Sequence, residues 1–461
     1  MYIQQLYTNC LAQAAYYIEN NGQAAIIDPM RDVDEYINLL HNRGAKLKYI
    51  FETHFHADFV SGHIDLAKKT GAKIIFGPGA KPSYEADIAG DGDTLFLGEC
   101  QIKILHTPGH TIESICCLLM DENEKPYALF SGDTLFVGDV GRPDLLSGNL
   151  SAAELASQLY DSLNNKIKNL PDDVIVYPGH GPGSACGRSL GQELQSTIGM
   201  QKQLNYALQP MDRKDFIEAV TADQPAPPPY FFKDAAINKY GYEPLEKVTK
   251  KAHRKLSTND INEQLKKDIT ILDVRTETEY TNLHIKGSIH IGLNGSYAVW
   301  VGTLIDINQP IIIVCEKNTD KEAITRLGRI GYENIIGYYD DDIIHLTEIG
   351  KELCGLKCIE AKKLLPELSN EKNIVLDVRT VNEYNTSKIP NSLNIPLNEL
   401  LSNLHKLNKT DSYLINCAGG YRSLIAASLM EKNGFTSITN VNGGMSAIEK
   451  EAAEILYSSV S

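Results

Sequence analysis

Short apolar runs, each bounded by polar or turn-forming residues, recur through the first half of the chain. Runs of this length are typical of buried strands, and the longer mixed stretches between them are typical of helices. We therefore expect residues 1 to about 220 to alternate strands with helices in an α/β fold. The runs expected to form strands are Tyr16–Ile18, Ala24–Ile27, Tyr49–Phe51, Lys73–Phe76 and Val174–Tyr177.

The second half of the chain contains an internal repeat. Asp273-Val-Arg275 recurs 104 residues later as Asp377-Val-Arg379, each time after an apolar run. A further apolar run ends in a cysteine in both copies, at Cys315 and at Cys417. Each copy spans about 100 residues of alternating strand and helix, which is a normal domain size.

The length of the chain predicts several domains, and its cysteine content favours a reducing compartment. At 461 residues the chain is too long for one ordinary core, and the basic, polar run Lys247–Lys255 separates the repeat from the first half. We predict domains at residues 1–255, 256–355 and 356–461. The nine cysteines are scattered rather than arranged as a disulfide framework, and no signal peptide is visible, so we expect a cytoplasmic protein.

Charge excludes two classes of partner. The formal net charge is −15 and the pI is about 5.3, so the chain lacks the basic excess that nucleic acids or anionic membranes attract. No apolar run approaches the roughly 18 residues of a membrane span. We expect no nucleic-acid partner and no membrane partner.

The segment Thr53-His54-Phe55-His56-Ala57-Asp58-Phe59 directly follows an expected strand. Two imidazoles and a carboxylate at this spacing supply the ligands of a transition-metal site. Further candidate ligands follow at His110, Asp133 and His180. Their order resembles that of the metallo-β-lactamase superfamily, which implies an αββα sandwich.

Phe59 distinguishes this chain within that resemblance. Hydrolases of the superfamily usually carry a histidine there, which helps to hold a second metal, and a phenyl ring cannot ligate. The sequence therefore favours one metal with open coordination positions, which suits oxygen chemistry. His54, His110 and Asp133 could supply the two-His-one-carboxylate triad of an Fe(II) oxygenase.

The second repeat carries a cysteine loop, Cys417-Ala-Gly419-Gly420-Tyr-Arg422-Ser423, at the start of an apolar helix. Backbone N–H groups at a helix N-terminus, together with Arg422, favour an anion, so we expect Cys417 to be a thiolate that can carry sulfur as a persulfide. This loop and Asp377-Val-Arg379 resemble the rhodanese family of sulfurtransferases. The first repeat has no such glycines and places Asp320 where Arg422 stands, so we interpret it as a degenerate rhodanese domain.

The first domain also resembles the persulfide dioxygenases, through residues 53–58, Gly109-His110-Thr111, residues 131–134 and residues 138–144. This resemblance implies one Fe(II) per chain, held by His54, His110 and Asp133, and an anionic thiol bound by Arg142. The resemblance also implies that three further residues either contact these ligands or are alternative metal ligands; they are His56, Asp58 and His180. The loop Gly181–Arg188 resembles that of fusion proteins of the CstB type. In this chain, Cys186 of the loop either relays substrate sulfur or packs in the core.

The whole plan implies an enzyme of sulfide detoxification. A thiol persulfide and O₂ would yield sulfite and thiol, and the rhodanese domain would exchange sulfur between sulfite and thiosulfate. The resemblance also implies a homo-oligomer. The thiol, the direction of the rhodanese step, and transfer within or across chains stay open.

Two alternatives remain. One is a thioester hydrolase of the glyoxalase II type with two metals, fused to rhodanese domains. The other is a sulfur carrier that passes persulfide from Cys417 to a partner protein.

Overall fold

The structure is a computed structural model that describes residues 1–145, 150–188, 190–222, 224, 226–264, 267–370 and 372–457. Met1–Val248 and Leu327–Tyr332 make up one compact unit, and Thr249–Arg326 with Glu333–Ser461 make up a second. The second unit holds both copies of the repeat.

Two six-stranded sheets form the first unit, with strand orders β1-β2-β3-β4-β5-β6 and β12-β11-β10-β9-β8-β7. The five strands expected from the sequence are all present, as β2, β3, β4, β5 and β11. The first sheet contains β1 (Tyr2–Thr8), β2 (Gln13–Asn20), β3 (Gln23–Ile27), β4 (Lys46–Phe51), β5 (Lys73–Phe76) and β6 (Asp87–Ile88). The second contains β7 (Thr94–Leu97), β8 (Cys100–His106), β9 (Ile115–Met120), β10 (Pro126–Gly132), β11 (Ile175–Pro178) and β12 (Ser196–Thr197).

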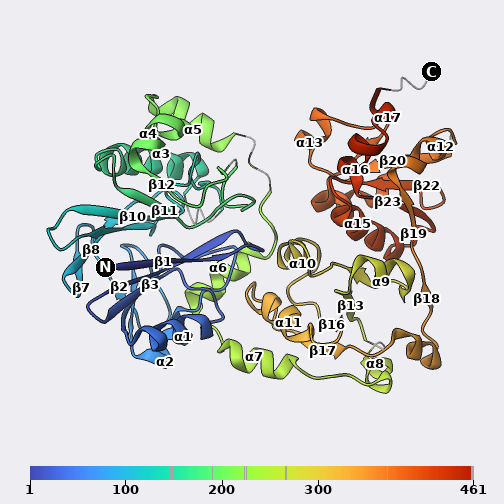
Figure 1. Cartoon of the computed structure of the whole chain (residues 1–461), viewed down its shortest axis with the longest axis horizontal. Coiled ribbons are helices and arrows are strands. Elements are labelled where there is room, and N and C mark those ends of the chain that lie inside the picture. The colour runs from blue at the N-terminus through green and yellow to red at the C-terminus, as the bar shows by residue number, and fades with distance from the viewer. Residues whose placement is uncertain are drawn as a thin grey trace. The chain divides into compact units, whose positions relative to one another are not determined.

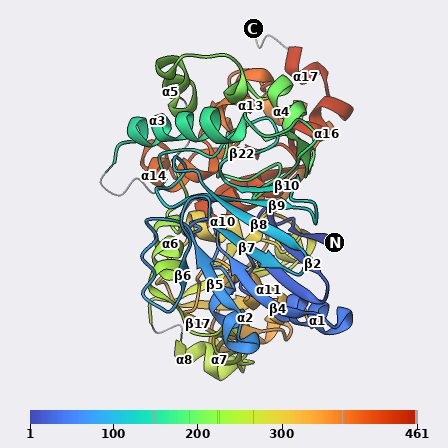
Figure 2. The ribbon, with the colours of Figure 1, turned by 90° about the vertical axis from the view of Figure 1, so that its left-hand side faces the viewer.

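Helices cover the outer faces of these two sheets (Figures 1 and 2). One apolar cluster, with Tyr16 and Phe130, fills the space between the sheets, while two others pack helices onto the outer faces. The layers are therefore helix, sheet, sheet, helix. The helices of this part of the chain are α1 (Asp34–Arg43), α2 (His63–Thr70), α3 (Ala152–Ser162), α4 (Ile198–Leu204), α5 (Arg213–Thr221), α6 (Phe231–Tyr240) and α7 (Leu245–Ala252), with a π-helix at Leu163–Ile167 and a 3₁₀ turn at Tyr206–Leu208.

Two parallel sheets in the second unit reproduce the repeat, in the orders β15-β13-β16-β17 and β19-β23-β22-β20-β21. Asp273 pairs with Val314 as Asp377 pairs with Asn416, so each strand that ends in the repeated aspartate neighbours the strand that leads to the cysteine. The strands are β13 (Thr270–Asp273), β14 (His284–Ile285), β15 (Ile289–His290), β16 (Ile311–Val314), β17 (Ile335–Tyr339), β18 (Leu353–Cys354), β19 (Lys357–Glu360), β20 (Asn373–Asp377), β21 (Leu393–Asn394), β22 (Ser412–Asn416) and β23 (Ser437–Asn442).

Helices flank both parallel sheets, as expected for strands that are buried on both faces. Thr380 and Glu383 form a capping box that starts α13. The helices are α8 (Thr258–Gln264), α9 (Glu277–Asn282), α10 (Tyr297–Leu304), α11 (Asp320–Gly328), α12 (Leu364–Leu368), α13 (Val381–Thr386), α14 (Leu400–Asn403), α15 (Tyr421–Lys432), α16 (Gly444–Glu451) and α17 (Glu454–Tyr457), with 3₁₀ turns at Ile343–Ile349, Ala361–Lys363, Leu397–Glu399 and Leu404–Lys406.

No helix in the described parts of the chain is long and apolar enough to cross a membrane.

Candidate functional site

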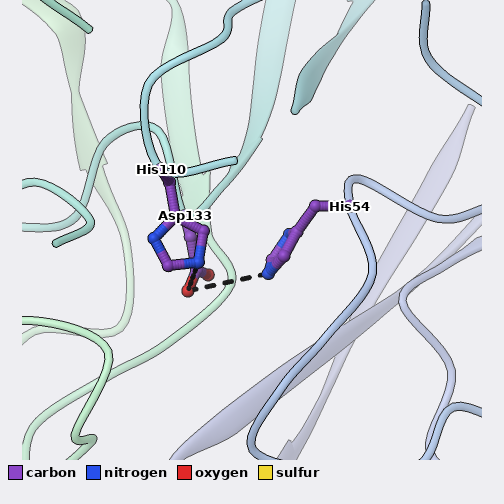
Figure 3. A group of neighbouring side chains, drawn as sticks. All are labelled: His54, His110 and Asp133. Atoms are coloured by element: carbon purple, nitrogen blue, oxygen red, sulfur yellow. Dashed lines mark ion pairs between the residues drawn. The ribbon is translucent and has the colours of Figure 1, made fainter. Parts of the chain in front are cut away.

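Three loops, each directly after a strand, bring the predicted iron ligands together. His54 follows β4, His110 follows β8 and Asp133 follows β10. Figure 3 shows the three side chains pointing toward one another. Asp133 Oδ2 lies 3.5 Å from His110 Nε2 and 3.9 Å from His54 Nε2, and all three residues are buried. One ligand atom from each lies within 4.8 Å of the others, which is a spacing that a single metal ion can bridge.

The histidines are oriented as metal ligands. His54 Nδ1 lies 3.0 Å from Thr53 Oγ1, whose hydroxyl donates to Asp28. His110 Nδ1 lies 2.8 Å from the backbone oxygen of Arg142. Each Nδ1 therefore donates its proton to an acceptor, which leaves the Nε2 lone pair facing Asp133, as in known metal sites. Burial, followed by the neighbouring imidazoles, lowers the pKa of His54 well below its ordinary value, which keeps that ring neutral.

The carboxylate of Asp133 needs a cation. Both of its oxygens are buried, and neither has a hydrogen-bond partner among the described residues. A buried carboxylate without donors is costly unless a positive charge compensates it. These residues therefore fit a divalent metal.

His56 lies beside His54, with ring centroids 4.2 Å apart, but its Nε2 is close to two other carboxylates. Its Nε2 lies 3.0 Å from Asp28 Oδ1 and 3.7 Å from Glu52 Oε2. Burial opposes a charge on the ring, but the two carboxylates outweigh it and raise the pKa of His56 to about 9. Phe59 is fully buried, and its ring lies 4.4 Å from that of His56. The Phe59 ring therefore packs against His56, and as a phenyl ring it offers no atom to a metal ion.

The remaining predicted ligands lie on the other side of Asp133. His180 Nε2 lies 3.6 Å from Asp133 Oδ1 and 3.5 Å from Asp58 Oδ2. Cys186 completes this group with Asp58 and His180. Burial, followed by the Asp58 and Asp133 charges, raises the pKa of the Cys186 thiol well above its ordinary value. The sequence left Cys186 between relay and packing, and the structure brings it to the metal cluster as a buried thiol.

Arg142 contacts the site through its backbone. Its carbonyl orients His110, and its N–H donates to the carbonyl of Cys186. Its buried guanidinium binds Asp144 at two points, 2.8 and 2.7 Å. The contact of Arg142 with an anionic thiol stays a prediction. The guanidinium that would make this contact already binds Asp144.

Two glycines that the sequence motifs do not identify as functional lie against the metal ligands. A Cβ on Gly141 would lie 2.0 Å from Asp133 O and 3.0 Å from His110 Nδ1, and one on Gly179 would lie 2.6 Å from Asp133 Oδ1. Backbone at both positions therefore approaches the ligands more closely than any side chain permits. Gly179 adjoins a predicted ligand, and Gly141 lies within the segment 138–144, yet neither spacing alone indicates this contact.

The cysteine loop of the second repeat surrounds a buried thiol. Cys417 Sγ accepts a 3.1 Å hydrogen bond from the Gly420 N–H and lies 3.4 Å from Ser423 Oγ. Gly420 has φ +102°, a conformation that favours glycine, and space lies open beside Gly419. The loop therefore provides one backbone donor to the sulfur, and the space beside Gly419 is open.

Arg422 is anchored rather than free. Its guanidinium binds Glu383 with distances of 2.8 and 2.6 Å. The backbone next to Gly444 also supports the cysteine loop. A Cβ on Gly444 would lie 2.2 Å from Cys417 O, so the two segments pack closely, and the N–H of Met445 donates to that oxygen. No local pattern indicates these supports, since Glu383 and Gly444 lie far from the loop in the chain.

The first repeat lacks this cradle. Cys315 is buried, and burial followed by Asp320 raises the pKa of its thiol to about 12. Asp320 itself lies 2.6 Å from His253 Nε2. A neutral, buried thiol beside a carboxylate is poorly suited to accept sulfur.

Comparisons with known proteins find two families in the chain. The family model described as the metallo-beta-lactamase superfamily matches residues 8–180, and the model of the rhodanese-like domain matches residues 257–343 and 360–451. A metallo-beta-lactamase structure from Staphylococcus aureus subsp. aureus COL is 34% identical, with a TM-score of 0.66, over 74% of this chain and 99% of that one.

Two proteins named as hydrolases are similar to part of the chain. A probable hydroxyacylglutathione hydrolase of Schizosaccharomyces pombe is 34% identical over 39% of this chain, and a hydroxyacylglutathione hydrolase of Pelagibacter ubique is 38% identical over 34% of it. The chain spans 66% and 61% of their respective lengths. The matches to both families confirm the predicted fold class.

Proposed function

Since the chain belongs to the metallo-beta-lactamase superfamily and continues into two rhodanese-like domains, we propose that it is a persulfide dioxygenase coupled to a sulfurtransferase. A low-molecular-weight thiol persulfide, O₂ and water would give the thiol and sulfite. In this overall balance the sulfane sulfur is oxidised, both atoms of O₂ are reduced, and the S–S bond breaks.

The single observation that carries this proposal is the ligand set on one side of Asp133. His54, His110 and Asp133 form a two-His-one-carboxylate group, while His56 is held by Asp28 and Glu52 and Phe59 cannot ligate. Three protein ligands leave room for both substrates on one ion.

These residues would hold one Fe(II) per chain, and iron supplies the site with O₂ activation and an anchor for sulfur. Two neutral imidazoles and one carboxylate leave a net positive charge on a bound divalent ion, which suits an anionic persulfide. Thr53 and the carbonyl of Arg142 keep the two rings oriented. Burial of the ligands keeps bulk water from competing for the site.

The second step would use Cys417. As a thiolate, it would attack the outer sulfur of a persulfide, so that the old S–S bond breaks, the substrate thiol leaves as its thiolate, and a cysteine persulfide forms. Sulfite would then take that sulfur, which yields thiosulfate and restores the thiolate. The Gly420 N–H would stabilise the thiolate when it leaves.

A specific observation also favours a second candidate. Two relatives are named hydroxyacylglutathione hydrolase, and Asp58, His180 and Asp133 could hold a second ion. A dinuclear thioester hydrolase fused to rhodanese domains is therefore the alternative.

Oxygen consumption separates the two candidates. Anaerobically purified, Fe(II)-loaded protein would receive glutathione persulfide or coenzyme A persulfide, and O₂, sulfite and thiosulfate would be quantified. We expect O₂ uptake that His110→Ala abolishes and Cys417→Ser retains, with thiosulfate lost in the latter. Thioester cleavage without O₂ uptake, with two metals per chain, would overturn the proposal in favour of the hydrolase.

A further inference from the structure

A second cluster of metal-binding side chains lies in the second unit, apart from the cysteine loop. His284 of β14, Cys354 of β18 and Glu431 in the last turn of α15 each offer one atom within 4.8 Å of the others. His284 and Cys354 are direct cross-strand partners in the antiparallel pair of β14 and β18. Glu431 reaches them from the second repeat, so the cluster joins the two rhodanese-like domains.

The three side chains lie at separations close to the edge lengths of a coordination tetrahedron, with one Glu431 oxygen facing His284 and the other facing Cys354. His284 Nε2 is 3.0 Å from Glu431 Oε2 and 3.3 Å from Cys354 Sγ, and Cys354 Sγ is 3.4 Å from Glu431 Oε1. Ligands at the usual bond lengths to Zn²⁺ are about 3.3 to 3.6 Å apart. A shift of a few tenths of an ångström would therefore place all three around one ion.

The histidine is oriented for metal binding rather than for proton transfer. A nucleophilic triad uses the two ring nitrogens separately, one for the cysteine and one for the carboxylate. Here Cys354 and Glu431 both face Nε2, while Nδ1 lies 2.8 Å from the carbonyl of Tyr280 and donates its proton there. A metal-ligating histidine typically donates its other N–H in this way.

The surroundings fix this ring in place. The Tyr280 ring stacks on it, with centroids 3.9 Å apart and planes 13° from parallel. The Gly287 N–H lies 3.4 Å from Glu431 Oε2 and supports the carboxylate. His284 is buried, whereas Cys354 and Glu431 are partly exposed, so an ion can enter from solvent.

We propose that His284, Cys354 and Glu431 form a Zn²⁺ site that joins the two rhodanese-like domains. The Cys354 thiol would lose its proton to solvent when the ion binds. One thiolate and one carboxylate would neutralise the dication, and water would fill the fourth position. Without an ion, burial followed by the Glu431 charge raises the pKa of Cys354 to about 12, so the thiol is protonated and poorly reactive.

Zinc content tests the site directly. The full chain would be stripped of metal with a chelator, dialysed against buffered Zn²⁺ and analysed by mass spectrometry for bound metal. We expect Cys354→Ser to bind one zinc fewer per chain than the unaltered protein, and Glu431→Gln to bind it at least 100-fold more weakly. The matched control is Cys358→Ser, a nearby cysteine outside the cluster, which should keep the full content. Equal zinc content in all four proteins would overturn the proposal.

Alkylation of the unaltered chain gives a second readout that depends neither on a variant that folds nor on activity. Zn²⁺ should slow modification of Cys354 by iodoacetamide at least 10-fold and leave Cys358 unchanged. Trypsin separates the two thiols, since Lys351, Lys357 and Lys362 bound peptides 352–357 and 358–362. An unchanged rate at Cys354 with saturating Zn²⁺ would rule the site out.

Discussion

The guanidinium of Arg422 meets the carboxylate of Glu383 at two points, with distances of 2.8 and 2.6 Å. Arg422 lies in the first turn of α15, at the end of the cysteine loop, and Glu383 lies in the first turn of α13. The pair therefore ties the loop that carries Cys417 to a second element of the same domain. A two-point ion pair fixes both the position and the plane of the guanidinium.

This pair predicts a dependence of stability on pH. Arg422 lowers the pKa of Glu383 to about 2, against an ordinary value of about 4.3 in an unfolded chain. A lowered carboxyl pKa stabilises the fold above the ordinary value, and this stabilisation is lost as the pH falls from about 4.5 toward 2. The Glu383 side chain is 36% exposed, so solvent screening reduces the contribution to about 1 kcal/mol.

Glu383→Gln should therefore lower the thermal unfolding midpoint at pH 7, and the difference from the unaltered protein should shrink at pH 3. The matched control is Glu279→Gln, at the equivalent capping position of the first repeat. Burial and Glu316 raise the pKa of Glu279, so this change should not cost stability at pH 7. A difference for Glu383→Gln that stays constant from pH 7 to pH 3 would contradict the assignment.

The two repeat cysteines predict opposite outcomes for one substitution. Cys417→Ser should reduce thiosulfate:cyanide sulfurtransferase activity at least 1000-fold, because a serine hydroxyl is not ionised at neutral pH and does not carry sulfur. Cys315→Ser, at the equivalent strand end, should leave the activity within 2-fold, since its thiol is neutral and lacks the glycine loop. Residual activity in Cys417→Ser would place sulfur transfer on another thiol.

Phe59→His predicts a change in metal content. The substitution adds an imidazole next to Asp58 in the sequence, and Asp58 and His180 lie together on the far side of Asp133. We expect the bound metal of the first unit to rise from one to two ions per chain, and the apoprotein to lose about 2 kcal/mol because a buried phenyl ring is replaced by a polar one. Metal analysis and chemical unfolding measure the two effects, and a metal content that stays at one would show that more than Phe59 excludes the second ion.

Gly141→Ala should disrupt the metal site of His54, His110 and Asp133 without changing a ligand. The added Cβ would meet Asp133 O at 2.0 Å, so the loop must move and carry Asp133 and His110 apart. We expect metal affinity to fall at least 10-fold and stability to fall by roughly 2 to 4 kcal/mol. Gly292→Ala is the control, because its Cβ would meet only ordinary contacts at 3.6 Å or more. Equal metal affinity in Gly141→Ala and the unaltered protein would show that a Cβ at position 141 does not displace the ligands.

Local patterns predict most of the architecture correctly. The apolar runs that become β2, β3, β4, β5 and β11 are long enough to be recognised alone, and only their ends differ from the prediction. The repeat around Asp273 and Asp377 predicts two related parallel sheets, because the same spacing of apolar runs folds in the same way twice. His54, His110 and Asp133 are recognisable because each belongs to a short motif that follows a strand.

The sequence by itself determined the order of the domains, the residue types at both sites, and the presence of a side chain at Phe59 that cannot ligate a metal. These follow from local spacing and side-chain chemistry, which need no knowledge of distant neighbours. Only the tertiary structure decided that His56 faces Asp28, that Arg422 is held by Glu383, and that His284, Cys354 and Glu431 meet. Those contacts join residues 28 to 147 positions apart, and no local motif encodes them, because folding alone brings their strands and helices together.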